Sequence, residues 1–405
     1  MEIRRYIILF FIVLIFNPNI LCGEDFNIKP GVVIKKENYT NYRNELQKLL
    51  PAGTFSLVDL NLEKGWVTIP VIEKKTYLPP RGFAAATAKN RGRLKVGKDN
   101  KIIGNWQGGA PFPEPKTGSE LGWDVYRRRE CGEEFKVYFE WKFFDKFTDK
   151  ERYFKNMFHK KNYVGRTDIE PMPSIFGKEE IYWKESLLVT DPFDVKGFSQ
   201  IRVHYEDITR ADDVFSYIPA LRRIRRLTGS DVTDPVLGAD SCYDDFEGWH
   251  QNMNKKMTFR NLGTSEFLVP SYYKKKPPEP YQKGSLFQVN WEIRPLYKLE
   301  VNMNDPDYAY SKKIFYVEKE RGTFEIAYGE GYDQKGRLWR STYTMIVRYY
   351  DPKSYITSYW GCIFSSHLDN HTSVMPAIPG DNFNLNDVFI PEECFSVRGL
   401  LKLAR

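Results

Sequence analysis

The densest group of charged residues in this sequence is an arginine-rich stretch followed closely by aspartates. Its members are Arg222, Arg223, Arg225, Arg226, Asp240, Asp244 and Asp245. Because a guanidinium group forms two parallel hydrogen bonds with a carboxylate or a phosphate, the arginines could hold an anionic headgroup while interleaved apolar residues anchor a sheet edge. The favoured interpretation is internal pairing, in which the arginines bind the aspartates. A calcium site made by the three aspartates is a third alternative, although their spacing is not that of an EF-hand loop.

Signatures of catalysis are absent from the sequence: it has no GxSxG nucleophile elbow, no phosphate loop and no HExxH zinc helix. Gly329-Glu330-Gly331 followed by Gly336 has the wrong spacing for a nucleotide-binding motif and is assigned to turn geometry. His367, Asp369 and His371 could bind zinc or copper, but a solvated loop is favoured because no fourth ligand is near in sequence. We therefore expect no enzyme, no metal and no cofactor, and an envelope hydrolase using these histidines is the disfavoured alternative.

The elements that must position these residues are mostly strands. Aromatic residues make up 16% of the chain, and they favour pleated, half-buried surfaces. Helices are expected at 44–50, where Pro51 ends the helix, and at 119–129. A turn at 332–337 between two strands predicts a hairpin, and we expect residues 234–249 to form a helix or ordered excursion on the concave side of the sheet. Strands are expected at 136–144, 200–205, 213–218, 257–262, 287–302, 312–317, 324–328 and 338–350.

The first 23 residues have the layout of a secretory signal peptide. Arg4 and Arg5 precede an unbroken apolar run at 6–16, and cleavage is expected near Gly23. A membrane anchor is disfavoured because eleven residues rise only roughly 16 Å as a helix. Lipidation of Cys22 is the other alternative, and it is disfavoured because Leu21 is not small. We expect a periplasmic protein with an N-terminal segment at 24–103 and a β domain at 104–405.

Charge and cysteine content limit the partners. The formal net charge is +7, and the charges are interspersed along the chain, so a nucleic-acid partner is not expected. Export makes disulfides possible among Cys131, Cys242, Cys362 and Cys394, although buried free thiols are an equal alternative and sequence alone cannot choose a pairing.

Several motifs between residues 104 and 350 together resemble a bacterial family of unknown function labelled outer-membrane lipoprotein-sorting protein, related in fold to the LolA and LolB carriers. These motifs are Gly109-Ala110-Pro111-Phe112-Pro113, Asp212-Asp213, the stretch 217–226, Asp234-Pro235 with Gly238, Asp240, Asp244 and Asp245, and the stretches 310–317 and 332–340. The resemblance implies a mainly β (α+β) fold, a strongly curved antiparallel sheet or half-barrel with helices on its concave side. Proteins of that fold carry acyl chains or lipoproteins, although this chain is much longer than a simple carrier.

We therefore expect a periplasmic binding or transfer protein for a lipid or another apolar ligand, working with an envelope transporter or an outer-membrane protein. The alternative is an interaction or scaffold protein associated with the outer membrane. Besides the arginines and aspartates above, aromatic and basic residues of the expected strands are candidates for contact with the ligand or partner: Trp291, Arg294, Tyr316, Trp339 and Arg340.

Overall fold

The structure is a computed structural model that describes residues 26–76, 78–129, 132–145, 151–227, 235–245, 253, 256–271, 286, 288–350, 355–376 and 389–403. The expected signal peptide, Cys22 and Cys131 lie outside these residues. Among the described residues, no helix is long and apolar enough to cross a membrane.

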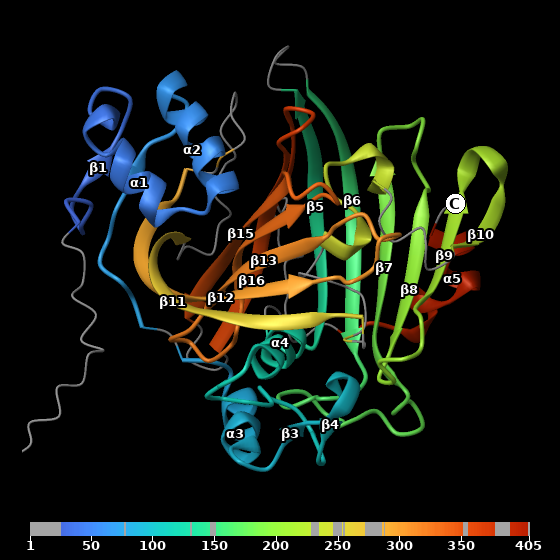
Figure 1. The fold of residues 1–405 in the computed structure, drawn as a ribbon. Helices are drawn as coiled ribbons and strands as arrows, with labels where there is room; N and C mark the ends of the chain where they lie inside the picture. Colours follow the sequence, from blue (N-terminus) through green and yellow to red (C-terminus); the bar gives the residue numbers. More distant parts are fainter. Residues whose placement is uncertain are drawn as a thin grey trace, which may run out of the picture.

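One antiparallel sheet of 13 strands dominates the fold (Figure 1). Its strand order is β10-β9-β8-β7-β6-β5-β17-β16-β15-β14-β13-β12-β11, so β10 and β11 are its two edges and the sheet is open. The strands are β5 (Glu134–Asp145), β6 (Glu151–Asn162), β7 (Ile181–Asp191), β8 (Ser199–Tyr205), β9 (Asp213–Ile218), β10 (Arg223–Leu227), β11 (Thr258–Ser271), β12 (Asn290–Asn302), β13 (Lys312–Glu318), β14 (Ile326–Tyr332), β15 (Leu338–Tyr350), β16 (Tyr355–Ser366) and β17 (His371–Pro376).

Helices and two small two-stranded sheets complete the described chain. The helices are α1 (Arg43–Leu49), α2 (Ala52–Lys64), α3 (Arg81–Asn90), α4 (Gly118–Tyr126) and α5 (Val397–Leu403). The small sheets pair β1 (Val33–Ile34) with β2 (Ile69–Pro70) and β3 (Lys95–Val96) with β4 (Ile102–Ile103). Short 3-10 turns are η1 (Tyr39–Asn41), η2 (Lys98–Asn100), η3 (Pro219–Leu221), η5 (Val236–Gly238), η6 (Tyr243–Asp245) and η7 (Glu392–Phe395).

The mainly β, curved antiparallel fold class is confirmed, and so are most of the expected elements. The expected helices at 44–50 and 119–129 are α1 and α4, and the hairpin at 332–337 closes through Asp333, whose amide lies 3.0 Å from the carbonyl of Arg337. Helix 44–50 is the only one expected in the N-terminal segment, and this is wrong because α2 and α3 also lie there. Of the strands in the large sheet, the strand pattern also misses β6, β7, β10, β16 and β17.

The register of the sheet separates its two faces. Val301, Lys313, Gly331 and Arg340 are cross-strand partners on β12 to β15 and therefore share one face, whereas Ser341 points to the other. Asp244 touches Lys313 on that first face, and the pKa of its carboxyl responds to Arg202 on β8. Strands β8 and β13 are eight positions apart, about 38 Å in a flat sheet, so the first face must be concave.

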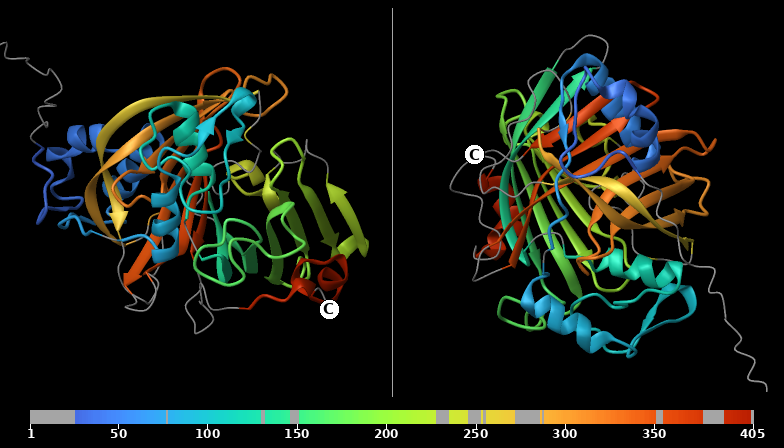
Figure 2. Two further views of the ribbon diagram at one scale, coloured as in Figure 1. Left: turned by 90° about the horizontal axis from the view of Figure 1, so that it is seen from below. Right: turned by 90° about the vertical axis from the view of Figure 1, so that its left-hand side faces the viewer.

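Helix α4 lies across this concave face (Figure 2). The Thr117 side chain and Glu120 form a capping box at its first turn. A Cβ atom on Gly118 would lie 2.2 Å from the carbonyl oxygen of Phe259, and one on Gly122 would lie 2.8 Å from the Phe259 ring, so both glycines permit close packing on β11. At the other end of the helix, Tyr126 reaches His204 on β8. Helix α4 thus connects two distant parts of the sheet.

The residues 235–245, here called the concave segment, also pack on this face. The amide of Asp240 donates to Ser373 on β17 at 2.9 Å, and Lys313 on β13 donates to the carbonyl of Asp244 at 2.7 Å. This placement confirms the expected excursion on the concave side for its described part. Helix α2 lies on the opposite face, where the amide of Gly53 donates to Glu330 at 2.9 Å. Helices therefore cover both faces of the β11–β17 half.

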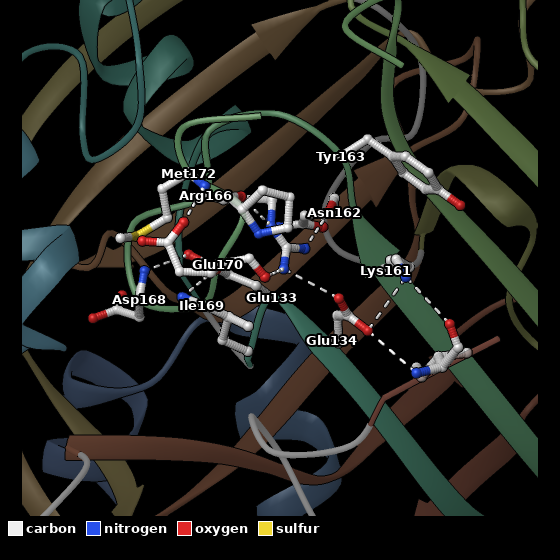
Figure 3. Close-up of polar contacts among 12 residues, drawn as sticks. Glu133, Glu134, Lys161, Asn162, Tyr163, Arg166, Asp168, Ile169, Glu170 and Met172 are labelled. Carbon is white, nitrogen blue, oxygen red and sulfur yellow. Dashed lines mark hydrogen bonds and ion pairs between the residues drawn. The ribbon is translucent and has the colours of Figure 1, made fainter. Parts of the chain in front are cut away.

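A buried arginine fixes the loop that joins β6 to β7 (Figure 3). Arg166 donates to the carboxylate of Glu134 at 3.1 Å and to the carbonyls of Asn162 and Pro171 at 2.7 and 3.0 Å. Next to it, Glu133 accepts the amide of Ile169 at 3.0 Å. Because these partners are backbone groups of the loop, the two glutamates hold the loop against the start of β5.

Candidate functional site

A buried polar cluster occupies the concave face over β13 and β15. Asp245 lies 2.9 Å from Lys313 Nζ and 3.3 Å from Arg340 Nη1, and it accepts hydrogen bonds from the Tyr310 hydroxyl at 2.7 Å and the Cys242 amide at 2.9 Å. Arg340 also donates to the Tyr310 hydroxyl at 2.9 Å. The carboxylate of Asp245 therefore ties the concave segment to two strands.

Asp244 occupies a different electrostatic environment from its neighbour. Burial raises the pKa of its carboxyl to about 6, and this effect outweighs the opposing influence of Lys313 and of the hydrogen bond from the Tyr308 hydroxyl. Burial also opposes ionisation of Asp245, but Lys313 and Arg340 outweigh it and lower the pKa of that carboxyl to about 2. Two adjacent carboxyls thus titrate in separate pH ranges.

A small pocket adjoins this cluster. Two glycines of β14 contribute to its lining: a Cβ atom on Gly331 would lie 2.7 Å from the Tyr310 ring, whereas one on Gly329 would make only ordinary contacts at 3.5 Å with Phe315. The assignment of Gly329-Glu330-Gly331 to turn geometry is wrong, because all three residues lie within β14. The pocket is lined by Asp245, Lys313, Phe315, Gly329, Glu330, Gly331, Arg340 and Thr342.

An apolar wall covers the concave face of β5 and its neighbours. Cross-strand pairing places Val137 opposite Phe158 and Phe158 opposite Leu187, so these three side chains share the concave face. Val137 is buried, whereas Phe158 and Leu187 are half-buried. The wall also includes Phe135, Phe139, Trp141 and Phe143 on alternate positions of β5.

The arginine stretch does not pair with the three aspartates, and this expectation is wrong. The arginines are exposed at the edge of the sheet, Arg222 directly after η3 and the other three on β10. Arg226 pairs with Asp213 of β9, and Arg222, Arg223 and Arg225 form no ion pair within the described part of the chain. Asp240, Asp244 and Asp245 instead bind residues of β13, β15 and β17. The fold separates the two groups because the sheet continues through many strands between them.

The remaining candidates are dispersed. Trp291 is fully buried and stacks on Tyr343 with ring centroids 5.8 Å apart, and Arg294 is enclosed by Glu292 and Glu318 at 2.7 and 3.5 Å. Tyr316 donates to Glu330 at 3.2 Å beneath α2. Each of these three side chains therefore contacts other residues of the fold and lies apart from the polar cluster.

Two of the candidate residues, Trp339 and Arg340, lie at the polar cluster. The Trp339 ring lies 5.3 Å from that of Tyr310 and is covered by the Arg340 guanidinium at 4.1 Å. Arg340 thus joins Asp244 and Asp245 there. The sequence does not mark Lys313, Tyr308 and Tyr310 as members of this cluster, because their spacing does not distinguish them from the other residues of the 308–317 stretch.

No metal-binding group of three or more side chains occurs among the described residues. His367 bonds Ser341 at 2.8 Å and His371 bonds Asp240 at 2.9 Å, so the two histidines take part in separate contacts. Neither Cys242 nor Cys394 forms a disulfide within the described ranges, and the Cys362 thiol lies 3.6 Å from the sulfur of Met375.

Comparison with known proteins identifies relatives by family and by fold. The family described as "Protein of unknown function (DUF1329)" matches residues 33–367. The crystal structure of a DUF1329 family protein from Desulfovibrio piger superposes with a TM-score of 0.50 at 16% identity, covering 70% of this chain and 97% of that chain. These two findings confirm the family resemblance expected from the motifs. Among curated proteins, none matches this sequence significantly.

Two further crystal structures are more distant. One, described as an outer membrane lipoprotein-sorting protein domain from Vibrio parahaemolyticus, has a TM-score of 0.48 at 15% identity and covers 71% of this chain and 97% of its own. The other, a LolA superfamily protein from Nitrosomonas europaea, has a TM-score of 0.43 at 13% identity and covers 70% of this chain and 98% of its own.

Proposed function

This chain belongs to the DUF1329 family, and from that premise we propose that it binds and transfers an amphiphilic lipid or similar apolar molecule on the concave face of its sheet. The observation that carries the proposal is the apolar wall at Val137, Phe158 and Leu187. Two of these side chains are only half-buried although they face the inside of a curved sheet.

The physical basis of the proposal is the hydrophobic effect. Each methylene group that a ligand transfers from water to an apolar surface contributes roughly 0.8 kcal/mol. A ligand chain lying on Phe158 and Leu187 would gain this contribution, and it would also remove the exposed part of both side chains from water. The role we propose is binding rather than catalysis.

We further propose that the protein acts in the periplasm, exported by a signal peptide at residues 1–23, and that it exchanges its ligand with an envelope transporter or an outer-membrane protein. Fractionation of cells and N-terminal sequencing of the purified chain test it. A chain recovered from the cytoplasm with Met1 intact would contradict the location.

The binding proposal is tested by extracting the purified mature protein with organic solvent and identifying co-purified molecules by mass spectrometry. We expect an amphiphile in a stoichiometric amount. Protein that yields no amphiphile, and that takes up none when mixed with vesicles of envelope lipids, would overturn the proposal.

A pair of variants locates the ligand. Leu187→Asn places an amide in the apolar wall and is expected to abolish recovery of the amphiphile. Val203→Asn is the matched control, because Val203 is also half-buried but lies on the convex face, and it should leave recovery unchanged. Circular dichroism and thermal unfolding establish that both variants remain folded.

A further inference from the structure

A row of directly paired residues runs across six strands of the concave face, from β5 to the edge strand β10. Residues that lie opposite each other in antiparallel strands share a face, so the whole row faces inward. In order, the residues are Val137, Phe158, Leu187, Gln200, Ser216 and Arg225.

The chemical character of this row changes steadily along its length. Its first three side chains are apolar, and the next two are polar, with the Gln200 amide donating to the Ser216 hydroxyl at 2.7 Å. The row ends on Arg225, which is exposed and forms no ion pair with any described residue. Adjacent strands are about 4.8 Å apart, so Leu187 and Arg225 are separated by about 14 Å along the sheet.

A second cation lies beside the end of this row. Arg223 is two residues before Arg225 on β10, shares its face and is also exposed without an ion pair in the described chain. Arg226, by contrast, points to the other face and pairs with Asp213. The positive charge at the concave rim is therefore available to a ligand, whereas the charge on the convex side of the same strand is already compensated.

We infer that the ligand is an amphiphile with an anionic oxygen headgroup, carboxylate or phosphate, whose headgroup binds Arg223 and Arg225 and whose chain extends along the row toward Leu187 and Phe158. This inference rests on the proposed function and names its ligand class. A guanidinium group binds an oxyanion through paired, charge-assisted hydrogen bonds, whereas a cationic headgroup would be repelled at this rim. Gln200 and Ser216, which are buried and hydrogen-bonded to each other, form the polar part of the row between the charged end and the apolar wall.

The experiment measures binding of four single-chain probes to the full mature chain by isothermal titration calorimetry: dodecanoate, dodecyl phosphate, 1-dodecanol and dodecyltrimethylammonium. We expect both anions to bind at least about tenfold more tightly than the alcohol, as one charge-assisted contact implies, and the cation to bind most weakly. The relative affinities of dodecanoate and dodecyl phosphate distinguish the two headgroups.

Two arginine variants on the same strand assign the contact. Arg225→Gln should weaken binding of the anions toward that of the alcohol, with Arg223 retaining part of the preference, and should leave the affinity for the alcohol unchanged. Arg226→Gln removes the same charge from the opposite face and should change neither affinity. Because Arg225 is exposed on an edge strand, its substitution is not expected to unfold the protein, and thermal unfolding checks this.

The outcomes separate this inference from the proposed function. Equal affinity for the alcohol and both anions, or equal effects of Arg225→Gln and Arg226→Gln, would overturn the anionic headgroup while the binding function stands. Failure of all four probes to bind would overturn both. Selective loss of anion binding in Arg225→Gln alone would support the assignment.

Discussion

The hydroxyl of Tyr126, at the last position of α4, is hydrogen-bonded to Nε2 of His204 on β8, whereas Gly118 and Gly122 of the same helix pack on Phe259 of β11. His204 is itself held by Asp212, whose Oδ1 lies 2.6 Å from the histidine Nδ1. One helix of nine residues therefore connects the third strand of the sheet with an edge strand at the opposite end. This connection fixes the curvature of the concave face.

Loss of the Tyr126 hydroxyl should destabilise the fold. Tyr126→Phe leaves the ring in place but deprives a buried imidazole nitrogen of its partner, which costs about 1–3 kcal/mol. Chemical denaturation measures the change in the free energy of unfolding. Tyr153→Phe is the control, since Tyr153 is 45% exposed and its hydroxyl can bond water, and an equal loss in both variants would contradict the role of Tyr126.

A methyl group at Gly331 should be poorly tolerated. Gly331→Ala would place Cβ 2.7 Å from the Tyr310 ring, below normal contact distance, and we expect a loss of about 1–3 kcal/mol as this ring is displaced. Gly329→Ala is the matched control two residues away on the same face, where the nearest atoms lie at 3.5 Å. If urea denaturation shows the two variants equally stable, Tyr310 does not pack against the strand as described.

Acidification from pH 7 to about 4 should stabilise the fold through Asp244. The pKa of this carboxyl is raised from 3.8 to about 6 in the folded protein, mainly by burial, so the folded state binds the proton more tightly than the unfolded state. The increase in unfolding free energy that protonation of Asp244 provides begins as pH falls through about 6 and is complete near 4. Its size is up to about 3 kcal/mol.

The Asp244→Asn variant isolates this contribution, because an amide does not titrate. The difference in unfolding free energy between wild type and variant should depend on pH between about 6 and 4. Asp245→Asn is the comparison: its carboxyl has a pKa lowered to about 2 by Lys313 and Arg340 against the effect of burial, so its contribution is present above about pH 4 and is lost only toward pH 2. A pH-independent difference for Asp244→Asn would contradict the environment described for that carboxyl.

Substitution of Lys313 should destabilise the folded protein more than substitution of its neighbour Lys312. Lys313→Met leaves the buried carboxylate of Asp245 without the ammonium group 2.9 Å away, and breaking such a buried pair costs about 3–5 kcal/mol. Lys312→Met is the control, because the Lys312 side chain is 34% exposed and pairs with Glu300 at 3.6 Å, an arrangement worth less than about 1 kcal/mol. Thermal unfolding of both variants tests the difference, and similar transition temperatures would refute it.

The sequence by itself determined those elements in which the local pattern of apolar, polar and turn residues matches the burial and backbone conformation found in the fold. Strand β5 alternates Phe135, Val137 and Phe139 with polar residues, and the 332–337 turn has Gly336 at a positive φ of 74°. By contrast, α2 contains Gly53, Thr54 and Asn61 among its residues and shows no clear local helical signal. It is a helix because Leu57, Val58 and Leu62 are buried in the core on the face of the sheet opposite α4, and such burial is a tertiary effect.

Charge pairing was decided only by the tertiary structure. Arginines and aspartates close in sequence favoured mutual ion pairs, yet β10 is an edge strand while Asp244 and Asp245 reach back to β13 and β15. The same folding brings Lys313 and Arg340 to one carboxylate and aligns Val137, Leu187 and Arg225 in one row. Composition and spacing indicate which segments form strands and where charged residues occur in the chain. The order and register of the strands determine which side chains meet, because those contacts join residues far apart in the chain.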